Sequence, residues 1–226
     1  MTTSTEQQPL PQGVAAVTPE DDSNDPYLML TPEGVLYAFA EREPDETRAM
    51  LQTLLPRGAA LRRSEWLAQG PGYQPLLVRA QHEGWVSEMA YEQKHEQHLQ
   101  LDSYLTHAIA GLSGSRRAAI ASDQGFCLAY AGYSEREAET ISAAAVEFFD
   151  FAQRQRQRGF RGTGRAISFY EGIDMLMPTA SLVLFFVDGI GYWLILGGEP
   201  LLNSRALVEV IWSIRLTGSR YTAQPS

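Results

Sequence analysis

The pattern of apolar and polar positions divides the chain into a helical first part and a mixed second part. Between residues 27 and 86, short apolar groups with helical spacing follow helix starts such as Thr31-Pro32. Breaks such as Gly70-Pro71-Gly72 separate them. This pattern predicts a small helical domain over residues 27–86 and shows no strands. Residues 1–26 are polar and aperiodic, so we expect a disordered tail there.

The second part begins after a polar stretch at 87–98, which is a linker or the exposed start of a helix. Leu101, Leu105, Ile109 and Leu112 then have the spacing of one apolar helix face. Two short apolar runs follow, at 118–122 and 126–130, on either side of a turn that contains Gly125. They predict a tight hairpin of two buried strands.

A long helix is predicted from Glu135 to about Arg158. Ser134 and Glu137 have the spacing of a capping box, and arginines in the last turns followed by Gly159 give the stop signal. Its apolar positions form two stripes, so one side can cover a sheet while the other meets a second copy. The residues that we expect at this dimer interface are Ile141, Ala145, Val146, Phe148, Phe149 and Ala152.

Strand-like runs follow at 166–170, 182–187 and 192–196, with a further short run at 175–177 whose assignment the sequence leaves open. A last helix starts after Asn203 and ends at Gly218. The predicted α/β unit, residues 99–218, therefore has the order α-β-β-α-β-β-β-α around a central antiparallel sheet. Residues 219–226 form a tail.

This order of elements, together with the hairpin phrase Ser122-Asp123-Gln124-Gly125, resembles the roadblock/dynein light-chain family. That family has a strand, Ser-x-Asp-Gly, a second strand and an Ala-rich helix at the same place. The turn here is one residue longer than the common Asp-Gly pair. The resemblance covers roughly residues 99 to 217. It implies a roadblock-like sandwich without a catalytic signature, and a homodimeric regulator of small Ras-like GTPases, as among bacterial members.

Charge and composition exclude several classes of function. Residues 1–98 hold 15 acidic and 7 basic residues and the remainder 12 and 11, so neither half has the excess of basic residues that nucleic-acid binding requires. The chain has no apolar run long enough for a membrane helix and no apolar signal core. Cys127 is its only cysteine, which excludes an internal disulfide and indicates a cytoplasmic protein.

Chemistry-bearing motifs are missing from the sequence. It contains no Ser-His-Asp, Cys-His or zinc-finger spacing, and nothing completes a ligand set around His95 and His98. We therefore expect no enzyme activity of its own, no metal and no cofactor. Function then lies in a surface, for which the candidate partner-binding residues are Arg154, Arg156, Arg158 and Trp212.

Two alternatives remain open at this stage. In the first, residues 27–86, whose outline is similar to a winged-helix unit, read DNA as part of a transcriptional regulator and the second part only dimerises. Arg57, Arg62 and Arg63 are the one basic cluster there. In the second, the protein is a small-ligand sensor whose pocket is lined by Phe169, Tyr170, Tyr192 and Trp193.

Overall fold

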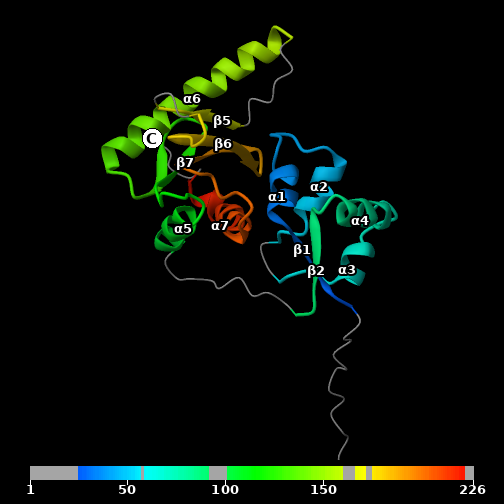
Figure 1. The fold of residues 1–226 in the computed structure, drawn as a ribbon. Coiled ribbons are helices and arrows are strands. Elements are labelled where there is room, and N and C mark those ends of the chain that lie inside the picture. The colour runs from blue at the N-terminus through cyan, green and yellow to red at the C-terminus, as the bar shows by residue number, and fades with distance from the viewer. Residues whose placement is uncertain (1–24, 57–58, 92–100, 160–165, 172–174, 222–226) are drawn as a thin grey trace, which may run out of the picture.

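The structure is a computed structural model that describes residues 25–56, 59–91, 101–159, 166–171 and 175–221. Figure 1 shows a sheet with helices on both of its faces and, to one side of it, the elements of the N-terminal part.

The N-terminal part contains two strands as well as helices. Its elements are β1 (Tyr27–Leu30), α1 (Pro32–Ala38), α2 (Glu46–Gln52), α3 (Arg63–Leu67), α4 (Tyr73–His82) and β2 (Val86–Met89). β1 and β2 pair antiparallel, with Tyr27 opposite Met89 and Leu30 opposite Val86. The prediction of helices alone was therefore incomplete, because each strand has four residues and its pairing partner lies at the far end of the unit.

The C-terminal part has the predicted order of elements. These are α5 (Leu101–Ala110), β3 (Ala118–Ser122), β4 (Cys127–Ala131), α6 (Glu135–Gln157), β5 (Ala166–Phe169), β6 (Ala180–Val187), β7 (Ile190–Gly197) and α7 (Arg205–Tyr221). The sheet has the order β4-β3-β7-β6-β5, and every pair in it is antiparallel. The short run at 175–177 is not a strand, and its side chains are exposed.

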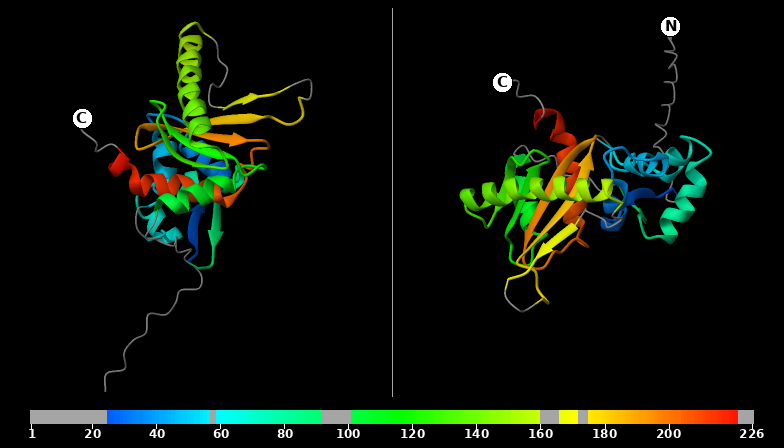
Figure 2. Two further views of the ribbon diagram at one scale, coloured as in Figure 1. Left: turned by 90° about the vertical axis from the view of Figure 1, so that its left-hand side faces the viewer. Right: turned by 90° about the horizontal axis from the view of Figure 1, so that it is seen from above.

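Alternation along the central strands creates two cores. In β7, Tyr192, Leu194 and Leu196 belong to the core on the side of α5 and α7, whereas Trp193 and Ile195 belong to the core beneath α6. Figure 2 shows the same three-layer arrangement, with α6 alone on its face. Small side chains meet under α6, namely Ala119 and Ala121 of β3 with Ala138 and Ala145 of the helix. The helix can therefore lie close to the sheet.

The N-terminal part packs directly against α7 and the β6–β7 end of the sheet. The Phe186 N–H of β6 donates to the Phe39 carbonyl at 2.9 Å. The guanidinium of Arg215 on α7 donates to the carbonyls of Gln52 at 2.5 Å and Leu55 at 2.8 Å, where α2 ends. One continuous apolar cluster joins the two parts. We therefore propose residues 27–86 and 99–218 as two units of one packed structure, with the separating segment 87–98 starting inside β2.

Candidate protein-interaction surface

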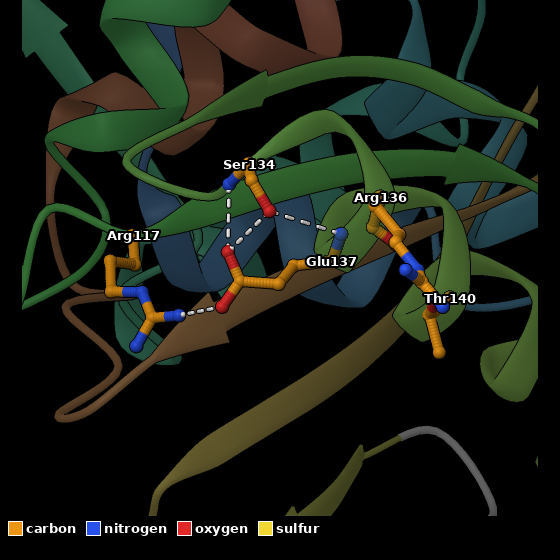
Figure 3. A network of polar contacts seen from close by, with 5 residues as sticks. All are labelled: Arg117, Ser134, Arg136, Glu137 and Thr140. Atoms are coloured by element: carbon orange, nitrogen blue, oxygen red, sulfur yellow. Dashed lines mark hydrogen bonds and ion pairs between the residues drawn. The ribbon is translucent and has the colours of Figure 1, made fainter.

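The start of α6 is held by a small polar network (Figure 3). The Ser134 N–H donates to the Glu137 carboxylate at 2.8 Å, and the Glu137 N–H donates back to the Ser134 hydroxyl at 3.3 Å. Arg117 on the hairpin side donates to the other oxygen of Glu137 at 3.0 Å. The Ser134 N–H and hydroxyl, and then Arg117, hold the pKa of Glu137 below its ordinary value. The capping box predicted from the sequence is thus present and fixes where the helix begins.

The inner side of α6 packs against the sheet of its own chain. Ala145 is fully buried, and Ile141, Phe148 and Phe149 are half-buried against the core beneath the helix. The Phe148 ring lies 4.9 Å from the ring of Phe169 on β5. Ala145 therefore cannot contact a partner, which corrects its assignment to a dimer interface. The rings of Phe148 and Phe149 are half-buried, so part of each ring remains exposed to solvent.

Two further members of the predicted dimer interface are placed differently. Val146 is half-buried and lies beside Gly125 of the hairpin turn, where a side chain on the glycine would approach its Cγ2 to 3.1 Å. The side chain of Ala152 lies outside the described residues. The interface residues expected from the sequence are thus spread over the buried side and one flank of the helix, rather than gathered on an outward face.

The distal part of α6 forms the most exposed apolar and basic surface of this helix. The helix extends past the sheet in Figures 1 and 2. Phe151 is 53 % exposed, and Arg154 and Arg158 are exposed as well, while the side chain of Arg156 is not described. We call Phe148, Phe149, Phe151, Arg154 and Arg158 the distal α6 surface. Phe151 was missed in the sequence, although it lies three positions after Phe148 and so shares its flank.

Trp212 does not belong to any outer surface. Only 4 % of it is exposed, and its indole N–H donates to the Pro56 carbonyl at 3.0 Å. The residue closes the contact between α7 and the segment after α2. Its assignment as a partner-binding residue is therefore wrong, because a side chain buried between the two units cannot reach a separate protein.

A second exposed apolar group lies between β5 and β6. Tyr170, Met175, Leu176 and Met177 are 39 %, 65 %, 93 % and 55 % exposed. The sequence leaves the run at 175–177 open as a possible fourth strand, and the structure places it outside the sheet. These side chains add apolar surface close to the edge strand β5.

The residues of the ligand-sensor alternative do not converge. Tyr192 is buried on the α5 and α7 side of the sheet, whereas Trp193 is buried beneath α6. Phe169 packs on Phe148, and Tyr170 is partly exposed. Because neighbouring residues of a strand point to opposite faces, these four side chains cannot line one pocket.

Two of the three arginines expected of a DNA reader form contacts within the N-terminal unit. The Arg62 guanidinium lies 4.7 Å from the centre of the Tyr27 ring and donates to the Asp25 carbonyl at 3.2 Å. Arg63 pairs with Glu88 at 3.2 Å, and Arg57 lies outside the described residues. The contacts of Arg62 and Arg63 therefore lie with residues of their own unit.

Metal chemistry and membrane crossing find no support in the described parts of the chain. There, no three His, Cys, Asp or Glu side chains come together in a way that could bind a metal ion, and His95 and His98 fall outside those parts. No helix of the described residues combines the length and apolar character that crossing a membrane requires.

Comparison with known proteins yields structural similarity and no match in sequence. No family model matches the chain, and no curated protein does. Similar solved structures include the roadblock/LC7 domain from Streptomyces avermitilis, with 13 % identity and a TM-score of 0.34, covering 54 % of this chain and 95 % of that one. Another is MglB of Myxococcus xanthus, with 11 % identity and a TM-score of 0.34, covering 59 % and 97 %.

Proposed function

We propose that this protein is a non-enzymatic regulator or scaffold that forms a homodimer and, as a dimer, binds a small Ras-like GTPase. The observation that carries the proposal is the distal α6 surface, where exposed Phe151 and half-buried Phe148 and Phe149 lie on a helix that extends past its own sheet. Exposed aromatic side chains on a helix are costly in water, and a second protein surface removes that cost.

The dimer is favoured by the continuity of this surface with an open sheet edge. β5 is the last strand on its side of the sheet, and Phe169 of β5 packs on Phe148 of α6. Among the described residues no strand follows on the outer side of β5, so one surface offers both a sheet edge and apolar side chains. A two-fold axis beside β5 would bring two such edges and two α6 helices together, because a symmetric contact uses the same patch on both copies.

The Ras-like GTPase follows from the resemblance of the sequence, and the charge of the distal α6 surface supports it. Arg154 and Arg158 are exposed in and just after the last turn of α6, with Arg156 between them in sequence. Arginine is a frequent hot-spot residue, and a cluster of this kind suits an acidic patch on a partner. Such a partner would be regulated through the conformation of its switch loops rather than by chemistry of this chain.

The dimer is tested by charge placed in the apolar part of the surface. Phe151→Glu should convert a dimer at micromolar concentration to a monomer in analytical ultracentrifugation, with an unchanged far-ultraviolet circular dichroism spectrum. The matched control is Val78→Glu on α4, because Val78 is also exposed, at 60 %, and lies on the N-terminal unit. A monomeric wild type, or a Phe151→Glu variant that remains a dimer, would contradict the proposed dimer.

The partner is tested by titrating the dimer against Ras-like GTPases of the source organism, loaded with GDP or with a non-hydrolysable GTP analogue. We expect saturable binding that differs between the two nucleotide states and weakens in an Arg154→Glu/Arg158→Glu variant. Equal binding in both states, or none to any such GTPase, would remove the GTPase and leave a homodimeric scaffold.

A further inference from the structure

The opposite edge of the sheet carries a groove with its own chemistry. β4 is the last strand on that side, and α5 and α6 pack on it from the two faces of the sheet. In Figure 2 (left) the β3–β4 hairpin lies between α6 and α5. A pocket of about 430 Å³ opens here, lined by Thr106 of α5, by Cys127, Leu128, Ala129 and Tyr130 of β4, and by Glu135 and Glu139 of α6. Four of its seven lining residues therefore belong to the edge strand.

β4 is an edge strand of the described sheet, so its backbone is the next feature of the groove. On its inner side β4 pairs with β3, with Tyr130 opposite Ala119 and Ala129 opposite Ile120. The register shifts between Ile120 and Ala121 of β3, and Ala121 lies opposite Cys127. On the outer side of β4 no strand follows among the described residues. An edge strand presents alternate N–H and C=O groups outward, and an extended segment can join the sheet by bonding to them.

The walls of the groove decide which segment fits. The charged side chains among its lining residues are Glu135 and Glu139, and both are acidic. Tyr130 of β4 is 39 % exposed, and Phe126, the residue just before the strand, is 68 % exposed, so both add aromatic surface. Tyr130 pairs with Ala119, whose side chain lies in the core beneath α6, so Tyr130 shares the face of the two glutamates, whereas Leu128 and Ala129 pack on the α5 side. An extended segment that alternates apolar and basic residues would match this arrangement, since one row of its side chains meets the carboxylates beside Tyr130 and the other meets the apolar α5 side.

We propose that the groove along β4 binds an extended, lysine- or arginine-bearing segment of a partner protein, which adds to the sheet as a sixth strand. The chain's own N-terminal stretch does not have the required charge, because residues 1–24 hold Glu6, Glu20, Asp21 and Asp22 and no basic residue. This site is separate from the distal α6 surface, which lies with β5 at the other edge. It stands or falls independently of the proposed dimer and GTPase.

The direct test uses short fluorescein-labelled peptides and the full-length protein. The probe is Lys-Val-Lys-Val-Lys-Val-Lys, and its controls are the Glu-Val counterpart and a version with proline at the central position. Fluorescence anisotropy should show saturable binding of the Lys-Val peptide only, because the acidic peptide is repelled and proline removes a ladder hydrogen bond. Binding should weaken as salt is raised, since the carboxylates are close to solvent.

The protein variants assign the binding to the groove. Glu135→Gln/Glu139→Gln should weaken binding of the Lys-Val peptide by roughly 3- to 30-fold, the range expected for two partly exposed charge pairs. The matched control is Glu147→Gln, an exposed glutamate further along the same helix. In nitrogen-15 spectra the amide signals that shift with peptide should belong to residues 127–131.

Three results would overturn the proposal. The first is no saturable binding of the Lys-Val peptide up to about 1 mM, the weak end of specific recognition. The second is equal binding of the acidic peptide, or amide shifts centred on β5 and the distal α6 surface. The third is loss of self-association in the Glu135→Gln/Glu139→Gln variant, because that outcome would make a second copy of this chain the occupant of the edge.

Discussion

Arg215 provides a quantitative test of how the two units are joined. Its side chain is 19 % exposed and lies 3.6 Å from the Asp188 carboxylate, while it donates to the carbonyls of Gln52 and Leu55. Arg215→Met keeps the aliphatic stem and leaves the carbonyls at the end of α2 without their charged donor. A hydrogen bond to a charged group contributes about 1.5 to 3 kcal/mol, and two such bonds on one side chain are not additive. We expect a loss of about 2 to 4 kcal/mol in the free energy of unfolding.

The assay is urea unfolding followed by tryptophan fluorescence and by far-ultraviolet circular dichroism. Because one apolar cluster joins the units, both probes should report a single coincident transition, shifted to lower urea in Arg215→Met. The control is Arg205→Met on the same helix, whose partner Glu209 lies 3.3 Å away at a surface where Arg205 is 47 % exposed. That change should cost less than about 1 kcal/mol. Equal effects of the two variants, or a separate early transition of the N-terminal unit, would refute the reasoning.

Three further predictions concern local features. Gly34→Ala places a Cβ 2.0 Å from the Trp85 carbonyl oxygen and should lower the free energy of unfolding in urea by about 3 kcal/mol. The control is Gly70→Ala, whose added Cβ would have a Tyr73 ring atom at 3.7 Å as its nearest neighbour, and it should lower that free energy by well under half as much. Ser134→Ala should cost about 1 kcal/mol through the lost N-cap of α6. The fold lowers the pKa of Glu137, so the contribution of its carboxylate to stability is complete above the ordinary carboxyl pKa and is lost as the pH falls through the folded value. The effect of Ser134→Ala on the free energy of unfolding should therefore shrink in acid. An equal effect at neutral and strongly acidic pH would contradict this. Burial raises the pKa of the Cys127 thiol, so iodoacetamide should modify it more slowly at neutral pH in the folded protein than in urea, and equal rates would show that the thiol is not shielded.

The elements of the C-terminal unit were predictable because their signals are local. The two runs on either side of Gly125 became β3 and β4, and Gly125 has the positive φ of 87° that the turn requires. Ser134 and Glu137 form the capping box at their sequence spacing of three residues. Each of these signals lies within a few residues of chain, so neighbouring groups satisfy it wherever the segment is placed.

Other features could not be decided from the sequence because they depend on distant parts of the chain. Strand β1 needed β2 as its partner, and the short apolar stretch at 27–30 carries no sign of that pairing. The run at 175–177 is apolar enough for a strand but has no neighbour in the sheet. Local composition shows that a segment can form a strand, whereas the ladder of hydrogen bonds requires a second segment at the right distance.

By itself the sequence determined the order and type of the elements from residue 99 onward, the start of α6 and the acidic character of the chain. Only the tertiary structure decided which apolar residues are hidden and which are exposed. Trp212 and Ala145 were expected at outer surfaces and lie inside, while Phe151 was overlooked and is half exposed. The physical reason is that helical periodicity defines which residues share a face, but burial of that face depends on what the fold places against it. Here the sheet covers one side of α6, and the N-terminal unit covers Trp212 on α7.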